Sequence, residues 1–232
     1  MSREIGAVLT DVEGTTTSIS FVYDVLFPYA AARLDEYCGD YGGRPDPELA
    51  EALARLRLEQ TEESAGGALA DYARKLMAED RKSTGLKLLQ GVIWEEGYRT
   101  GALRSHVFPD VPGALAAWRA AGVRLRVFSS GSVRAQKLLF AHTEVGDLTP
   151  HFEGYYDTTT GPKREVASYQ AIADDWGLLP REILFLSDVR EELDAAAGAG
   201  MRTGFVVRPG NRVVEPGGHA VYEDFTALAG LP

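Results

Sequence analysis

Hydrophobic and polar positions follow two patterns along this chain. Short apolar runs end in small, polar or acidic residues, and longer stretches repeat apolar residues at helical spacing. Apolar runs with the length of strands occur at residues 5–9, 123–128, 152–156, 183–186 and 203–207. Helical patterns occupy residues 111–121, 133–140 and 165–176, and Asp110 is the expected N-cap of the first. Strands that alternate with helices predict an α/β, Rossmann-like parallel sheet with helices on both faces.

The segment between residues 18 and 105 has a different pattern, because helical spacing dominates it. The apolar residues with this spacing are Leu49, Leu53, Leu56, Leu69, Tyr72, Ala73 and Leu76. Clusters rich in glycine and proline at 39–47 and around 64–67 are expected to break the helices. We therefore expect two domains: residues 1–17 with 106–232 as the α/β catalytic core, and 18–105 as an inserted helical cap. An insertion that leaves the carboxyl end of the first strand is expected to act as a lid over a site there.

Two acids follow the first apolar run. Asp11 and Glu13 stand at the carboxyl end of the expected strand, where ligands bind in open parallel sheets. Two carboxylates held about 4 Å apart repel each other by roughly 1–4 kcal/mol, so the pair favours a bound cation. Oxygen ligands suit Mg²⁺ best. The alternative interpretation is turn chemistry alone, since Asp and Gly favour turns.

Hydroxyls follow the second strand of the expected core. Ser129, Ser130 and Gly131 lie between this strand and the next helix, where free backbone N–H groups and hydroxyls bind phosphate. Simple N-capping of the helix would give the same pattern.

A lysine and a further acid follow later strands. Lys163 comes after Gly-Pro and suits a phosphate as a compact point charge, although a solvated surface lysine is the alternative. Asp188 ends a hydrophobic strand, which argues against a mere surface role. Its neighbours Glu191, Glu192 and Asp194 are expected to face solvent or to cap the next helix.

The composition narrows the classes of partner. A net charge of −10 opposes binding to nucleic acid and to anionic lipid. The four histidines lack the spacing of a zinc site, and the lone Cys38 is expected to be inert. Neither a membrane span nor a signal peptide is apparent, so we expect a cytoplasmic protein.

Asp11, Ser129, Lys163 and Asp188 stand at four strand ends in chain order. This constellation resembles the haloacid dehalogenase superfamily, whose four motifs supply a nucleophilic Asp, a Ser or Thr, a Lys and an acid that binds Mg²⁺. The inserted segment corresponds to the cap of that superfamily.

Further motifs along nearly the whole chain sharpen the resemblance. They are 11-DVEGTT-16, 27-FPY-29, 89-LQG-91 with Trp94, 129-SSGS-132, 135-AQKLLF-140 and 207-VRPGN-211. Together they resemble the enolase-phosphatases of methionine salvage, in which Glu stands at the position of Glu13 where most superfamily phosphatases have Asp. The resemblance implies a bifunctional Mg²⁺-dependent enzyme and a monomer. Its substrate would be a small phosphorylated diketone, 2,3-diketo-5-methylthiopentyl-1-phosphate, which is enolised and then dephosphorylated to the acireductone 1,2-dihydroxy-3-keto-5-methylthiopentene.

The resemblance also implies roles for individual residues. Asp11 would be the nucleophile, Glu13 the acid and base or an orienter of the metal, and Lys163 a catalytic and substrate-binding cation. The implied metal ligands are Asp11, Glu13 and Asp188. The implied substrate contacts are Ser129, Ser130, Gly131 and Lys163 in the core, and Gln90, Gly91 and Trp94 in the cap. For Trp94, packing within the helices is the alternative.

Two other functions fit parts of the pattern. A general small-molecule phosphatase of the same superfamily would lack the enolase step. A receiver-like signalling domain also surrounds Mg²⁺ with acids, a hydroxyl and a lysine, but the large insertion after the first strand argues against it. The residues do not identify the group that removes the proton during enolisation.

Overall fold

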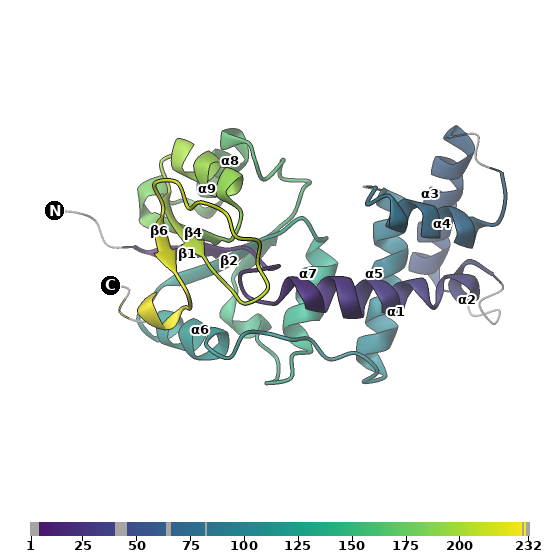
Figure 1. Cartoon of the computed structure of the whole chain (residues 1–232), viewed down its shortest axis with the longest axis horizontal. Coiled ribbons are helices and arrows are strands. Elements are labelled where there is room, and N and C mark those ends of the chain that lie inside the picture. Colours follow the sequence, from purple (N-terminus) through teal and green to yellow (C-terminus); the bar gives the residue numbers. More distant parts are fainter. Residues whose placement is uncertain (1–4, 40–45, 64–65, 82, 229, 231–232) are drawn as a thin grey trace. The chain divides into compact units, whose positions relative to one another are not determined.

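A computed structural model describes residues 5–39, 46–63, 66–81, 83–228 and 230 (Figure 1). The chain divides into two compact units, Met1–Phe21 with Arg104–Pro232, and Val22–Leu103. The first unit contains the sheet and the second is helical.

The sheet of the first unit is parallel and six-stranded in the part of the chain that the structure describes. Its strands are β1 (Ala7–Thr10), β2 (Arg124–Phe128), β3 (Gly154–Tyr156), β4 (Ile183–Ser187), β5 (Arg202–Val206) and β6 (Ala220–Tyr222). The strand order is β3-β2-β1-β4-β5-β6, which confirms the expected Rossmann-like fold. The chain adds strands on one side of β1 and then on the other, so a topological switch point lies between β1 and β4. The apolar pattern missed β6, which is a short edge strand with exposed or half-exposed side chains.

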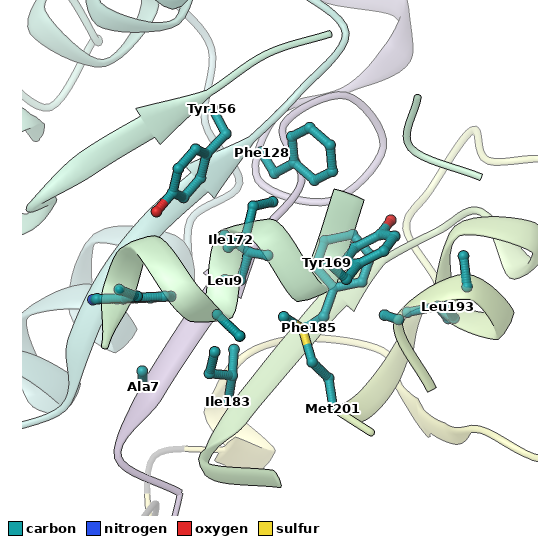
Figure 2. Packing of buried hydrophobic residues seen from close by; sticks show 14 of the residues in the cluster. Ala7, Leu9, Phe128, Tyr156, Tyr169, Ile172, Ile183, Phe185, Leu193 and Met201 are labelled. Atoms are coloured by element: carbon teal, nitrogen blue, oxygen red, sulfur yellow. The ribbon is translucent and has the colours of Figure 1, made fainter. Parts of the chain in front are cut away.

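Helices cover both faces of this sheet. They are α6 (Val111–Ala120), α7 (Val133–Ala141), α8 (Val166–Trp176) and α9 (Arg190–Gly198), with α8 and α9 on one face and α6 and α7 on the other (Figure 1). Under α8, the ring of Tyr169 lies 5.6 Å from that of Phe128 and 5.1 Å from that of Phe185 (Figure 2). This apolar layer, which also contains Leu9, fixes β1, β2 and β4 beneath the helix.

Asp110 occupies the N-cap position of α6, as expected, but its side chain does not cap the helix. Its backbone is helical and its side chain accepts no hydrogen bond from the N–H groups of α6. The carboxylate accepts two bonds from the guanidinium of Arg208, at 2.9 and 2.8 Å, and one from the N–H of Phe225. A charged, buried guanidinium is a stronger partner than a helix N–H group, so it takes the carboxylate.

The second unit contains α1 (Phe27–Ala31), α2 (Leu34–Cys38), α3 (Pro47–Glu62), α4 (Leu69–Ala78) and α5 (Thr84–Arg99), which follow a π-helix at Phe21–Leu26. The apolar residues expected at helical spacing are buried in α3 and α4, except Leu69, which is half-buried at the start of α4. At Gly85, a Cβ would lie 2.5 Å from the backbone N of Leu56, so the glycine permits close packing of α5 on α3. Residues 40–45 and 64–65 of the two expected breaks lie outside the described residues.

Candidate active site

Asp11 lies at the point where the sheet reverses its strand order. It follows the last residue of β1, and its N–H donates to the carbonyl of Leu186 in β4 at 2.9 Å. The residue is only 4% exposed. The carboxyl ends of the two strands therefore hold this carboxylate at the position where open α/β sheets bind ligands.

Lys163 lies beside Asp11 although 152 positions separate them in the chain. Its Nζ is 2.7 Å from Asp11 Oδ1, and the residue is 7% exposed, so the surface-lysine alternative is wrong. The hydroxyl of Tyr169 in α8 donates to the Lys163 carbonyl at 2.7 Å, which fixes the backbone of this loop. Burial disfavours the charged ammonium, but the charges of Asp11 and Glu192 outweigh it and raise the pKa of Lys163 above its usual value.

Glu192 is the acid that sequence reasoning misplaced. It lies in the first turn of α9 and is buried, whereas Glu191 and Asp194 are exposed as expected. Its Oε2 is 2.6 Å from Lys163 Nζ and accepts a hydrogen bond from Ser187 Oγ at 3.1 Å. The available signal was its position one turn before the buried Ala195 and Ala196, on the apolar face of the helix.

Asp188 completes the acidic group after β4. A Cβ placed on Gly14 would lie 2.2 Å from Asp188 Oδ2, so only a glycine lets the turn after Asp11 approach this carboxylate. Gly14 also has a φ of +73°, which favours glycine for a second reason. Burial, followed by the charge of Asp11, raises the pKa of Asp188 to about 7. Burial and Asp11 likewise raise the pKa of Glu192 to about 7.

The charges of this site fit a divalent cation. Three acids, Asp11, Asp188 and Glu192, lie around the ammonium of Lys163. Burial, and after it the charge of Asp11, raises the pKa values of Asp188 and Glu192. Among the described residues, no three His, Cys, Asp or Glu side chains are arranged to hold a metal ion alone. Mg²⁺ in proteins commonly binds one or two carboxylates together with water and substrate phosphate. Asp11 and Asp188 fit this arrangement.

We expect the metal-free protein to lose stability as the pH rises from about 5.5 to 8. The folded-state pKa values of Asp188 and Glu192 lie above the ordinary values of 3.8 and 4.5, so the folded protein binds more protons. The stabilisation is complete below the ordinary values and is lost as the pH passes about 7. Thermal unfolding in a chelator should show the fall, and millimolar Mg²⁺ should offset it at pH 8. A melting temperature that stays constant or rises over this range in chelator would contradict the prediction.

Two of the serines after β2 accept hydrogen bonds from nearby backbone N–H groups. Ser129 Oγ accepts the N–H of Gly131 at 3.1 Å, and Ser132, rather than Ser129 or Ser130, caps α7 through the N–H of Ala135. β2 pairs directly with β1, and Thr10 is in register with Val127. Ser129 therefore follows the strand adjacent to that of Asp11.

The expected cap contacts Gln90, Gly91 and Trp94 all lie in α5 and are buried within the helical unit. The indole N–H of Trp94 donates to the carbonyl of Leu26 at 2.9 Å, and its ring stacks on Phe27 with 6.3 Å between centroids. Packing inside this unit is therefore observed for Trp94, and contact of the three residues with substrate stays a prediction.

Two further expectations from the sequence concern the reactivity of Cys38 and membrane-spanning helices. Burial raises the pKa of Cys38 to about 11, so its thiol is almost entirely protonated near neutral pH and is a poor nucleophile. Within the described ranges, no helix combines the length and the apolar character needed to cross a bilayer.

Comparison with known proteins agrees with this geometry. A family model described as haloacid dehalogenase-like hydrolase matches residues 5–200. The chain is 52% identical to Enolase-phosphatase E1 of Pseudomonas aeruginosa (strain UCBPP-PA14), over 97% of this chain and 98% of the relative. It is also 52% identical to Enolase-phosphatase E1 of Sorangium cellulosum (strain So ce56), over 96% and 97%.

Solved structures give the same picture of the fold. The crystal structure of the UTR4 protein of Saccharomyces cerevisiae superposes with a TM-score of 0.81 and is 36% identical, covering 95% of this chain and 98% of that one. CbbY of Rhodobacter sphaeroides, solved in complex with phosphate, has a TM-score of 0.58 and 21% identity over 98% and 99%. The second likeness concerns the fold alone.

Proposed function

Because the chain belongs to the haloacid dehalogenase-like hydrolases and, within them, to the enolase-phosphatases, we propose that the residues gathered at the β1–β4 switch point perform its chemistry. The chain is an enzyme of methionine salvage, an acireductone synthase that enolises a phosphorylated diketone and then releases phosphate. The observation that carries the assignment of residues is the 2.7 Å contact between Lys163 Nζ and Asp11 Oδ1 in a buried site at strand ends.

In the proposed dephosphorylation, Asp11 attacks phosphorus and forms an aspartyl-phosphate while the ester oxygen leaves. Lys163 Nζ donates to Oδ1 of Asp11 at 2.7 Å, and Ser187 Oγ donates to Oδ2 at 3.4 Å. We assign the attack to Oδ2, because its contact is the longer of the two. Glu13 donates a proton to the leaving oxygen and then takes one from the water that attacks the aspartyl-phosphate. Water then releases inorganic phosphate and regenerates the Asp11 carboxylate.

Positive charge is the main requirement of this step, because phosphoryl transfer depends on electrostatic stabilisation of the phosphoryl oxygens. Lys163 supplies it from the protein, and Glu192 and Tyr169 hold that lysine in place. We propose that Asp11 and Asp188 hold Mg²⁺, which would supply further positive charge to the phosphoryl group. Orienting this metal is the alternative to the acid and base role of Glu13. Ser129, Ser130 and Gly131 are the proposed phosphate contacts.

For the enolisation we propose that Lys163 stabilises the negative charge that develops on a substrate carbonyl oxygen. Its ammonium is buried and fixed by two carboxylates, so little reorganisation is needed as the charge develops. The substrate that we propose is 2,3-diketo-5-methylthiopentyl-1-phosphate, and the product is 1,2-dihydroxy-3-keto-5-methylthiopentene.

A single assay separates this activity from that of a general phosphatase. Purified protein with Mg²⁺ and the phosphorylated diketone should develop the absorbance of the enol before free phosphate accumulates. Phosphate that appears with no preceding enol would contradict the enolase step. A phosphorylated protein that is stable for minutes and does not turn over would indicate a receiver-like domain instead.

Other expectations from the sequence are also proposals. We propose that residues 18–105 act as a lid that carries Gln90, Gly91 and Trp94 to the substrate. We further propose a cytoplasmic monomer that does not bind nucleic acid, which size-exclusion chromatography and a DNA-binding assay would test.

A further inference from the structure

In the turn after Asp11, residues 12–17, four N–H groups donate to carbonyls of the same turn, whereas three carbonyls accept from other segments of the chain. The N–H groups of Thr15, Thr16 and Thr17 all lie within 3.3 Å of the Val12 carbonyl, and the N–H of Gly14 donates to the Thr17 carbonyl at 2.8 Å. Local hydrogen bonds therefore close the turn. They leave the carbonyls of Gly14, Thr15 and Thr16 for partners elsewhere in the chain.

Each of these three consecutive carbonyls receives a donor from a distant segment. Asn211 Nδ2 donates to the Gly14 carbonyl at 2.8 Å, and Arg208 Nε donates to the Thr15 carbonyl at 3.0 Å. The N–H of Phe108 donates to the Thr16 carbonyl at 3.0 Å. We call the two side-chain donors, Arg208 and Asn211, the carbonyl clamp.

The arginine of the clamp is held rigidly. Its guanidinium makes a bidentate pair with Asp110 and lies 4.5 Å from the ring centroid of Phe108 and 4.7 Å from that of Phe225. The side chain of Arg208 is 2% exposed. A donor that is packed on both sides and paired at two nitrogens fixes the carbonyl that it contacts.

The clamped turn carries Glu13 and contacts Asp188 through Gly14. We propose that Arg208 and Asn211 are positioning residues, which hold Glu13 and the Gly14 backbone in register with Asp11 and Asp188. The inference rests on the proposed function, because it assigns the clamp to the carboxylates named there. It also gives a role to the 207-VRPGN-211 motif, which the proposed reaction does not use directly.

Asn211 provides the sharper test, because it is half-buried while Arg208 is fully buried. Asn211→Ala removes the donor, and Asn211→Asp replaces it with an oxygen at unchanged volume. We expect both to lower kcat for phosphate release on the order of 10- to 100-fold, since displacement by about 1 Å can cost that much. KM should change less than about threefold, and the melting temperature should fall by about 2–4 °C, as for one lost hydrogen bond. Arg212→Ala, an exposed neighbour, is the matched control.

Amide hydrogen exchange in the absence of Mg²⁺ and substrate gives a second readout. The amides of Gly14 to Thr17 should exchange faster in both Asn211 variants and at the wild-type rate in Arg212→Ala. The proposal is overturned if kcat stays within twofold of the control, or if kcat falls while exchange in the turn is unchanged. Hydrogen exchange is measured without substrate, so its result does not depend on which residue is the nucleophile. A wrong nucleophile assignment would leave the exchange result unchanged, whereas a wrong role for the carbonyl clamp would change it.

Discussion

Asp11→Asn should lower kcat for phosphate release by a factor on the order of 10³ or more, because an amide cannot form the acyl-phosphate. The side chain keeps its shape and can still accept a hydrogen bond from Lys163 Nζ. The change is therefore expected to remove chemistry while the site stays assembled. Steady-state phosphate release, with a parallel measurement of the phosphorylated protein, gives the result.

The same substitution should leave the protein folded and at least as stable as the wild type in the absence of Mg²⁺. The charge of Asp11 is one cause of the raised pKa values of Asp188 and Glu192, so removing it relieves repulsion inside a buried cluster. Asp174→Asn, at an exposed position of α8, is the matched control and should change neither activity nor stability. Wild-type phosphate release by Asp11→Asn would show that Asp11 is not the nucleophile.

Arg208→Met should give the largest loss of stability, about 3–5 kcal/mol in the free energy of unfolding. The methionine keeps an apolar stem beside Phe108 and Phe225, but it removes the two hydrogen bonds that the guanidinium donates to the Asp110 carboxylate. Asp110 then keeps only the N–H of Phe225 in a site where its side chain is 12% exposed. An unpaired charge of this kind is costly to bury, and the melting temperature should fall on the order of 10 °C.

A double variant separates lost packing from the stranded charge. Asp110→Asn keeps an acceptor for the Phe225 N–H but carries no charge. The double variant should be less destabilised than Arg208→Met alone, because it buries no unpaired charge. The two changes in the free energy of unfolding should therefore not add. If the single variant loses less than about 1 kcal/mol, the pair does not stabilise the fold in the way that we describe.

The parts of the fold that sequence predicted are those with a strong local pattern. Apolar runs identified β1 to β5. The carboxyl ends of β1 and β4 located Asp11 and Asp188, and the segment after β3 located Lys163. Parallel strands bring such ends to one edge of a sheet, so spacing along the chain is not needed to infer proximity. The contact of Lys163 with Asp11 follows from this rule.

The errors occurred where a tertiary partner overrides a local preference. Asp110 has the residue type and position of an N-cap, yet the buried guanidinium of Arg208 binds it instead. Glu192 is charged and stands in the first turn of α9, where acids usually face solvent, but the ammonium of Lys163 compensates its burial. Each error depends on a cation that lies far away in the chain and that no local pattern reveals.

The two side chains of the carbonyl clamp come from a segment near the end of the chain, while the turn that they hold lies near its beginning. During synthesis on the ribosome, β1 and its acid are made first, but their final geometry must wait for residues 208–211 to emerge. A nascent chain that ends before residue 208 therefore lacks the side-chain donors to the Gly14 and Thr15 carbonyls.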